Sequence, residues 1–260
     1  MPQPPGCRRA IDLTVLPQVL LIEDDPSIRR FVNMALDGLP VQLAMATNLS
    51  EARSSLREGR FALVLTDLML PDGSGLDLLQ ELIEQRPAWR GEAELAVFSA
   101  GVNDEARAKL ARWGIHRILM KPISLADLER HVLECIQTPA APTAAGPAPG
   151  RQDTAARLRA IDKFFGGDTA LFDAFEITCH LQFALDIAQA DAAVAHGDLA
   201  ALRRLVHSLK TVLLTLGHAE WSALAARSEM AAADALPEAL PLWHELRSAL
   251  QRLIEANRPG

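Results

Sequence analysis

The first half of the chain alternates short apolar runs with amphipathic segments. Runs rich in Val, Leu, Ile and Phe predict strands at about 18–22, 41–45, 62–66, 95–98 and 117–120. Apolar residues at helical spacing predict helices at about 27–37, 50–58, 75–85, 103–112 and 124–137. Ser124 and Asp127 have the spacing of a capping box at the start of the last helix. Five strand–helix repeats predict a doubly wound, five-stranded parallel (βα)5 domain with helices on both faces of the sheet.

The second half of the chain carries only helical periodicity. The apolar spacing predicts helices at about 154–164, 168–195, 198–216, 219–233 and 237–257. Asp168 and Asp198 each follow a glycine and are expected to be N-caps, and Pro237 is expected in the first turn of the last helix. Long helical segments with short joints predict an all-α, up-and-down bundle. The predicted fold class is therefore α/β plus all-α.

A stretch rich in proline and alanine separates the two halves. Proline at this density blocks helix and ladder hydrogen bonds, so residues 138–152 are expected to form a linker. In the polyproline form residues 138–150 of it would span about 40 Å, at about 3.1 Å per residue, enough for two domains to touch or to separate. We therefore divide the chain into an N-terminal tail (1–16), an α/β domain (17–137), the linker (138–152) and a helical bundle (153–260).

Charge and cysteine content narrow the class of protein. The net charge of −7 is spread evenly, with 15 basic and 19 acidic residues in 1–150 and 11 basic and 14 acidic residues in 151–260. Neither half has the basic footprint of a nucleic-acid-binding domain. The three cysteines show no metal-ligand spacing and fit a reducing compartment. Residues 1–9 lack an apolar stretch, and no apolar run approaches the roughly 18 residues of a membrane helix, so we expect no signal peptide, no membrane span and a cytoplasmic location.

The carboxyl ends of four predicted strands carry acidic, basic or hydroxyl side chains. Glu23 and Asp24 follow the first strand, Asp67 the third, Ser99 the fourth and Lys121 the fifth. In a doubly wound sheet these ends share one rim, so the five side chains should converge. A single acid at a strand end is more often a helix N-cap or a solvated loop residue. The complete set at one rim indicates a site.

This set has the chemistry of a phosphoryl-acceptor site. Clustered carboxylates repel one another unless a cation binds them, and oxygen ligands without His or Cys favour Mg²⁺. Phosphoryl transfer needs an in-line nucleophile and positive charge around the moving group. We expect Asp67 to be the nucleophile and a metal ligand, with Asp24 holding the metal directly and Glu23 directly or through water. Lys121 would pair with the phosphoryl oxygens, and Ser99 would hydrogen-bond one of them.

Four motifs carry these residues: Leu21-Ile22-Glu23-Asp24-Asp25, Thr66-Asp67-Leu68-Met69-Leu70-Pro71-Asp72-Gly73-Ser74-Gly75, Phe98-Ser99-Ala100 and Met120-Lys121-Pro122. Together they make residues 17–137 resemble the receiver domain of two-component response regulators. The resemblance implies that Asp67 is phosphorylated from a donor phosphohistidine. It also implies that Mg²⁺ is held by Glu23, Asp24, Asp67 and the backbone carbonyl of Met69, while Ser99 and Lys121 contact the phosphoryl group.

Two departures from the family pattern carry further expectations. The family usually has an aromatic residue three positions before the lysine, where this chain has Ile118. Chemistry at Asp67 should survive, but the usual rearrangement of the fourth and fifth strand–helix units is left open. Met69 and Gly101, two residues after Asp67 and Ser99, offer no polar side chain to guide a hydrolytic water. We therefore expect a fairly long-lived aspartyl phosphate.

His207 is a second candidate acceptor. Apolar residues of the predicted helix 198–216 form a stripe at spacings of three and four: Leu199, Leu202, Val206, Leu209, Leu213 and Leu216. At about 100° per residue His207 lies roughly 130° from the centre of that stripe, so it is expected to face water. A lone exposed histidine is commonly only a solvated surface residue, but a neutral imidazole is also a good nucleophile. Arg204 and Thr211 share its side of the helix, Leu214 lies near it, and Arg204 and Lys210 could hold an incoming phosphate.

The residues around His207 carry a second set of motifs: His207-Ser208-Leu209-Lys210, Leu216-Gly217, Gly197-Asp198-Leu199 and Phe164-Phe165-Gly166-Gly167-Asp168. On these motifs residues 154–257 are similar to the histidine-containing phosphotransfer (HPt) domain, a four-helix bundle. The similarity implies that His207 accepts phosphate from one aspartate and passes it to another, without a nucleotide site. The family commonly has glycine directly after the lysine, where this chain has Thr211. That side chain could crowd an incoming receiver or lend a hydroxyl to the imidazole, and both possibilities are open.

Two acceptors in one chain predict a phosphorelay intermediate. A sensor histidine kinase would phosphorylate Asp67, the group would pass to His207, and a downstream response regulator would receive it. The chain would be a phosphoryl carrier rather than an enzyme, because the receiver would catalyse only its own phosphorylation and dephosphorylation. Neither a catalytic ATP-binding segment nor a basic recognition helix is visible, so neither nucleic acid nor a membrane is expected as a partner.

Two alternatives were weighed against the relay. In the first, only Asp67 is phosphorylated, and the bundle is a docking module in a non-catalytic switch. In the second, the chain is an aspartate-based phosphatase. Such enzymes usually need a second aspartate two residues after the nucleophile, and Met69 occupies that place, so we disfavour the phosphatase.

Overall fold

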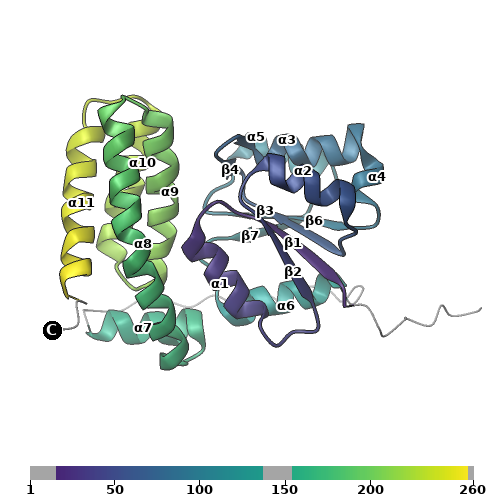
Figure 1. Cartoon of the computed structure of the whole chain (residues 1–260), viewed down its shortest axis with the longest axis horizontal. Coiled ribbons are helices and arrows are strands. Elements are labelled where there is room, and N and C mark those ends of the chain that lie inside the picture. The colour runs from purple at the N-terminus through teal and green to yellow at the C-terminus, as the bar shows by residue number, and fades with distance from the viewer. Residues whose placement is uncertain (1–15, 137–153, 257–260) are drawn as a thin grey trace, which may run out of the picture.

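The computed structural model describes residues 16–136 and 154–256, which form an α/β body and a helical bundle lying side by side (Figure 1). The predicted linker (138–152) and the predicted N-terminal tail (1–16), apart from Leu16, lie outside the described residues. The domain boundaries and the stiffness of the linker therefore stay predictions. Within the described ranges, no helix combines the length and the apolar character that a membrane span requires.

Five parallel strands form the predicted sheet, each within one residue of its expected bounds. They are β1 (Gln18–Ile22), β2 (Gln42–Ala46), β3 (Leu63–Thr66), β6 (Glu94–Ser99) and β7 (Arg117–Met120), in the order β2-β1-β3-β6-β7. The strand order reverses between β1 and β3. In sheets of this kind the crevice for a ligand opens at that point, beyond the carboxyl ends of the strands.

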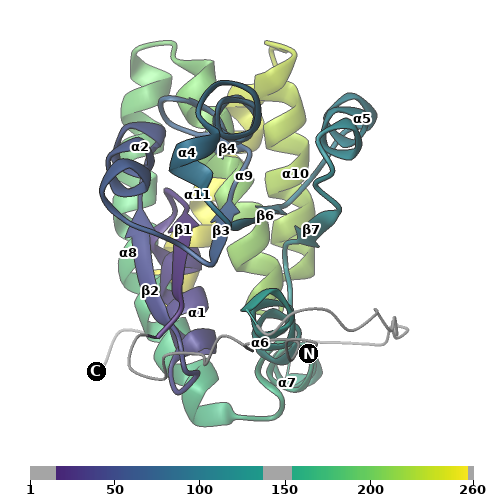
Figure 2. The same ribbon diagram turned by 90° about the vertical axis from the view of Figure 1, so that its right-hand side faces the viewer.

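Helices cover both faces of the sheet, as predicted (Figures 1 and 2). The first face carries α1 (Pro26–Leu36) and α6 (Leu125–Ile136), and the second carries α2 (Leu49–Glu58), α3 (Gly75–Gln80) and α5 (Asp104–Arg112). Successive strand residues supply alternate cores: Val19 and Leu21 pack on the first face, and Leu20 and Ile22 on the second. This double burial explains why the strands are continuous apolar runs.

The predicted helix 75–85 is divided. α3 ends at Gln80, a π-helical turn (η1) spans Glu81–Gln85, and α4 spans Pro87–Arg90. Pro87 explains the break, because proline lacks a backbone N–H and disfavours helical angles in the residue before it, here Arg86 with φ −136° and ψ 54°. The apolar pattern also missed a hairpin of β4 (Met69–Leu70) and β5 (Gly73–Ser74), since strands of two residues carry no recognisable alternation.

The second half is helical, as predicted. It contains α7 (Thr154–Phe165), α8 (Thr169–Ala195), α9 (Leu199–Thr215), α10 (Ala219–Ala233) and α11 (Ala239–Ala256). The last four lie alongside one another, and α7 crosses one end of them (Figure 1). The predicted caps are confirmed, since Asp168 and Asp198 accept hydrogen bonds from Leu171 N and Ala201 N, each at 2.9 Å. The prediction for Pro237 is wrong, because it lies in the turn before α11, where Ala239 N bonds to Leu236 O at 3.1 Å.

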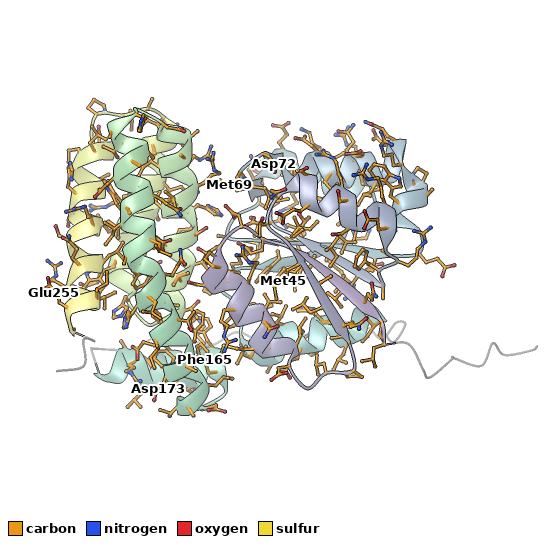
Figure 3. All side chains as sticks on the ribbon, in the orientation of Figure 1. Met45, Met69, Asp72, Phe165, Asp173 and Glu255 are labelled. Atoms are coloured by element: carbon orange, nitrogen blue, oxygen red, sulfur yellow. The ribbon has the colours of Figure 1, made fainter. Side chains whose placement is uncertain are left out.

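The bundle packs directly on the first face of the α/β body. α1 contacts α8 and α9, and α6 lies beside α7 (Figure 2). Phe31 of α1 meets Phe165 and Phe175 of the bundle edge to face, with ring centroids 5.7 Å apart in both pairs. Phe165 marks this junction in Figure 3. One apolar core therefore runs from the sheet through α1 into the bundle.

Gly217 provides a test of how the bundle is assembled. It follows α9 with φ +91°, and a Cβ at this position would lie 2.9 Å from the backbone oxygen of Ala156 in α7. We expect Gly217→Ala to destabilise the protein by about 2 kcal/mol or more, because both the backbone angle and the contact with α7 are strained. Gly197→Ala is the matched control, since Gly197 has φ +68° but open space around it. Chemical denaturation that gives equal losses for the two variants would contradict the contact.

Candidate functional site

Three of the five predicted rim residues converge in a buried pocket. Glu23 follows β1, Asp67 follows β3 and Lys121 follows β7, and all three are buried. The ammonium of Lys121 donates to Oδ2 of Asp67 at 2.6 Å and to the carboxylate of Glu23. The sheet topology alone brings them together, because β1 and β3 are neighbours and Lys121 reaches across from the edge strand.

The lysine keeps Asp67 ionised in this pocket. Burial by itself would raise the pKa of Asp67, but the charge and hydrogen bond of Lys121 hold that pKa below its ordinary value. The same attraction outweighs burial at Lys121 and raises the pKa of its ammonium. At Glu23 burial dominates and raises the pKa. Asp67 is therefore the carboxylate that stays charged and nucleophilic near neutral pH.

Asp24 has a different environment. Its side chain borders an open cleft, and burial together with the charges of Asp25 and Asp67 raises its pKa to about 6. Arg29 lies beside it but donates to the backbone carbonyls of Glu23 and Asp24, at 2.9 and 2.6 Å. Across the described ranges, no ion pair neutralises the carboxylate of Asp24. Asp25 caps α1 instead, accepting from Ile28 N at 2.8 Å.

The chemistry of these donors fits a hard divalent cation. Glu23, Asp24 and Asp67 offer only oxygen, and the loop to Met69 folds back so that its N–H lies 3.3 Å from Oδ1 of Asp67. Within residues 16–136 and 154–256, no three acidic, His or Cys side chains are already arranged around one point. Lys121, which bridges two of the carboxylates, supplies the positive charge in this arrangement. The repulsion felt by Asp24 is what a bound cation would relieve.

The backbone around Asp67 is fixed by close packing. Its carbonyl oxygen accepts from Thr66 Oγ1 at 2.8 Å, and Oδ1 accepts from Leu68 N at 2.5 Å. A Cβ at position 75 would lie 2.0 Å from the same carbonyl oxygen, so only glycine fits there. The hairpin of β4 and β5 thus returns the chain against the acceptor, which explains Gly75 in the motif.

The remaining rim residues lie as follows. Ser99 ends β6, is buried, and donates to the Gly101 carbonyl at 3.3 Å. Its hydroxyl also contributes to lowering the pKa of Asp67, after Lys121 and His207. Ile118 is partly buried and packs against the core on the second face of the sheet, and its apolar side chain lacks the hydroxyl of a tyrosine. Whether the fourth and fifth strand–helix units rearrange without an aromatic switch stays an open prediction.

His207 does not face water, and that prediction is wrong. The residue is only 6% exposed. Periodicity placed it correctly away from the leucine stripe, but the α/β body covers that side of α9. Arg204 lines a cleft shared with Asp24, and Thr211 lines a contact with Lys121. The imidazole of His207 is close enough to Asp67 to contribute to lowering its pKa.

Glu229 of α10 orients the imidazole and was missed by the sequence. Its Oε1 lies 2.6 Å from Nδ1 of His207, and its Oε2 accepts from Lys210 Nζ at 2.6 Å. Burial would raise the pKa of Glu229, but these two partners lower it to about 2. An ionised carboxylate only accepts, so Nδ1 carries a proton and donates it to Glu229. Nε2 is buried without a hydrogen-bond partner among the described residues.

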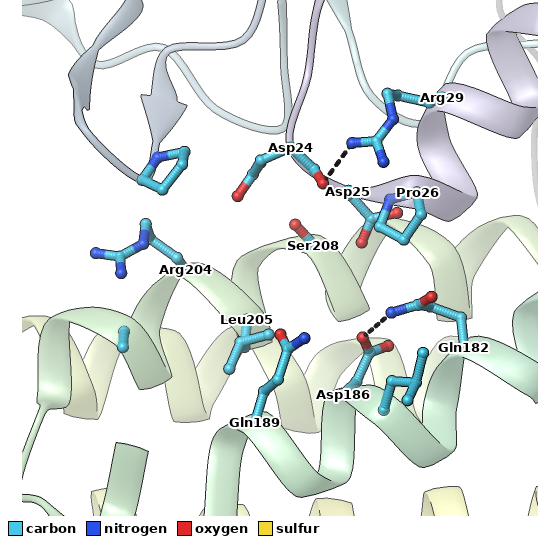
Figure 4. A pocket seen from close by; sticks show the side chains of 13 residues that line it. Asp24, Asp25, Pro26, Arg29, Gln182, Asp186, Gln189, Arg204, Leu205 and Ser208 are labelled. Atoms are coloured by element: carbon cyan, nitrogen blue, oxygen red, sulfur yellow. Dashed lines mark hydrogen bonds between the residues drawn. The ribbon is translucent and has the colours of Figure 1, made fainter. Parts of the chain in front are cut away.

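Lys210 and Arg204, the two residues predicted to hold a phosphate, have different surroundings in the structure. Lys210 forms a 2.6 Å ion pair with Glu229, and its role in holding a phosphate stays a prediction. Arg204 lines the cleft, which has a volume of about 490 Å³ (Figure 4). Asp24, Asp25 and Arg29 form one wall of it, and Asp186, Arg204 and Ser208 are on the other. The acid pocket and the histidine thus lie on opposite sides of one interface.

The comparison with protein families agrees with this geometry. The pattern of the response regulator receiver domain family matches residues 19–133. Residues 19–133 are a receiver domain. The receiver is 31% identical over 120 residues to "Response regulator protein PilR" of Pseudomonas aeruginosa, covering 46% of this chain and 26% of that protein. It is 27% identical over 129 residues to "KDP operon transcriptional regulatory protein KdpE" of Escherichia coli, covering 50% and 55%.

The chain therefore spans between a quarter and somewhat over half of the length of these curated relatives. Their activities as whole proteins are not thereby shown for this chain. Among solved structures, the receiver is similar to a response regulator receiver domain protein (CheY-like) from Methanospirillum hungatei JF-1. That similarity covers 47% of this chain and 95% of the other, at 23% identity and a TM-score of 0.43.

Asp186 in the cleft makes stability depend on pH. Burial raises its pKa to about 7, against a 2.7 Å hydrogen bond from Gln182 and with the charge of Asp25 adding to the rise. The unfolded chain loses this proton near pH 4, so the contribution of Asp186 to stability falls as the pH rises from about 4 to 7. We expect Asp186→Asn to raise the free energy of unfolding at pH 8 by about 2 kcal/mol, seen as a higher melting temperature, but not at pH 4. Asp162→Asn, at an exposed position, should leave stability unchanged at both pH values. An equal effect of Asp186→Asn at both pH values would contradict the raised pKa of Asp186.

Proposed function

We propose that this chain is a phosphorelay intermediate in which the bundle acts as an HPt domain. A sensor histidine kinase would phosphorylate Asp67, His207 would take the group, and a downstream response regulator would receive it. The observation that supports this most is the orientation of His207. Its Nε2 is buried without a hydrogen-bond partner among the described residues, on the side of α9 that packs against the receiver, near Asp67.

The transfer balances with the groups in this interface. The lone pair of Nε2 forms the N–P bond as the P–O bond to Asp67 breaks, which returns Asp67 to a carboxylate beside Lys121. The proton on Nδ1 stays, and the positive charge that develops on the ring is offset by Glu229 at 2.6 Å. Lys121 and Ser99 would contact the phosphoryl oxygens during the step. No further reactant is required.

Mg²⁺ is the cofactor that we propose for the receiver. Glu23, Asp24, Asp67 and the Met69 carbonyl would hold it, and when bound it would neutralise charge on the phosphoryl oxygens. Lys121 and Asp24 then have separate tasks in the pocket. Lys121 holds the nucleophile in its charged form, and Asp24 faces the open cleft. The long lifetime expected for the aspartyl phosphate, from Met69 and Gly101, stays a prediction.

Thr211 fits against this receiver without crowding. It is buried, and the contact that it lines with Ile28, Lys121 and Pro122 leaves a void of only about 10 Å³. This close fit supports the chain's own receiver as the partner of the bundle. Arg204, in the cleft beside Asp24, is the cation that we assign to steadying the phosphoryl group as it moves. The chain would thus be a carrier, active where kinase and regulator meet in the cytoplasm.

Phosphate labelling tests the relay. With a ³²P-labelled small acyl phosphate and Mg²⁺, we expect label on wild type in two chemical forms, a base-labile one on Asp67 and a base-stable one on His207. His207→Gln should lose only the base-stable form, and Asp67→Asn should lose both. His244→Gln, at an exposed histidine, should behave as wild type. Label confined to Asp67 in wild type would favour the alternative, a switch whose bundle is a docking module.

Glu229→Gln tests the orientation of the imidazole. The neutral amide can no longer offset the ring charge, and its NH2 group can donate to Nδ1 as readily as its oxygen can accept from it, so we expect transfer from Asp67 to His207 to slow by about tenfold or more. Labelling of Asp67 itself should stay within about twofold of wild type. Glu220→Gln, on the exposed side of α10, is the control. Rapid-quench measurement showing an unchanged transfer rate in Glu229→Gln would contradict this role.

A further inference from the structure

The interface between receiver and bundle is built as a close-packed contact on α1. Phe31 packs against both Phe165 and Phe175, which come from two different helices of the bundle and also contact each other. One turn earlier on α1, Ser27 lies close enough to Cys179 of α8 to lower the pKa of its thiol, against the larger effect of burial, which raises it. Ser27 is 1% exposed and Cys179 is fully buried. Polar and apolar contacts therefore both cross this boundary without solvent.

This packing closes access to both acceptors. Asp67 is 2% exposed and His207 6% exposed. The cleft beside them reaches Asp24 and Ser208, the neighbours of the two acceptors, but neither acceptor lines it. A kinase must bring its phosphohistidine to Asp67, and a downstream receiver must bring its aspartate to His207. Each of these partners needs the surface that the other half of the chain already occupies.

We propose that the docked arrangement is a closed state in which phosphate can pass only within the chain, and that uptake from any outside donor requires the receiver and the bundle to part. This inference rests on the proposed relay, because it assigns the interface a second task in that relay. The packing of Phe31 against the bundle is the contact that sets how often the interface opens. The acceptors themselves need no change between the two states.

The pair Ser27 and Cys179 allows the interface to be locked with one substitution. Both side chains are buried where α1 packs on α8, and Ser27 is near enough to affect the pKa of the Cys179 thiol, so a thiol at position 27 would lie against the native Cys179. In full-length Ser27→Cys, oxidation should form this disulfide, which a count of free thiols confirms. We expect uptake of label from a ³²P-labelled small acyl phosphate with Mg²⁺ to be at least tenfold slower in the oxidised protein than in the same protein after reduction.

Two controls isolate the lock. Ser27→Cys combined with Cys179→Ser keeps the new thiol but removes its partner, and wild type retains the chain's three native cysteines. Both should take up label at the same rate with and without oxidant. Equal uptake by oxidised and reduced Ser27→Cys, with the disulfide verified, would overturn the closed state.

A second variant keeps the proposal testable if the disulfide does not form. Phe31→Ala removes the contact of this ring with the bundle, so we expect uptake of the label to rise by about threefold or more while the fold is retained. Phe61→Ala is the matched control, because Phe61 packs in the other core, on the far face of the sheet. Uptake in Phe31→Ala equal to that in the control would count against the closed state.

The partition of label separates this inference from the relay. Protein loaded while reduced and then oxidised should still move label from Asp67 to His207, because the closed state is the one in which they face each other. Label that enters only when reduced but never reaches His207 would keep the closed state and reject the relay. Label that reaches His207 but enters the oxidised protein as fast as the reduced protein would keep the relay and reject the closed state.

Discussion

The ammonium of Lys121 between Glu23 and Asp67 is the interaction on which the receiver depends. A buried ammonium or a buried carboxylate would be destabilising alone, because burial removes its hydration. Together they form one hydrogen-bonded group at the carboxyl ends of strands that are distant in sequence. The lysine does more than balance charge, because it lowers the pKa of Asp67 while burial raises that of Glu23. Two similar acids in one pocket thereby acquire different protonation behaviour.

The bundle contains a comparable group of charged side chains, centred on Glu229. Glu229 binds His207 and Lys210 at once, so one carboxylate fixes the tautomer of the imidazole and holds a cation beside it. In both halves a buried ion pair prepares a nucleophile, an oxygen in one and a nitrogen in the other. The interface brings the two prepared groups together. In the relay that we propose, one contact surface would govern both the transfer between Asp67 and His207 and the access of partners to them.

The sequence predicted the local structure and the acid pocket well. The strands lie within one residue of expectation, because an apolar run covered on both faces leaves a clear signal. Glu23, Asp67 and Lys121 could be placed together because the topology of a parallel sheet follows from its strand–helix order. The helical periodicity of α9 also placed His207 on the correct side of its own helix.

The errors have a common physical origin. Periodicity reports which side of a helix its own core covers, but not what packs on the opposite side, so His207 was expected in water. Glu229 lies on the next helix, 22 residues away, and no local pattern marks it. Glu229 also accepts a hydrogen bond from Lys210, a contact that no local pattern around Lys210 indicated. Phe31 and Phe175 were unremarkable apolar positions until tertiary packing paired them across the interface.

Gly75 has a consequence for how such a protein can change. Any side chain there would displace the peptide that carries the acceptor, and with it the carboxylate held by Lys121. The loop that carries Asp67 therefore has almost no freedom to vary at position 75. Adaptation to new partners is left to the outer surfaces of α1 and α9, where side chains can be exchanged without moving the reacting oxygen.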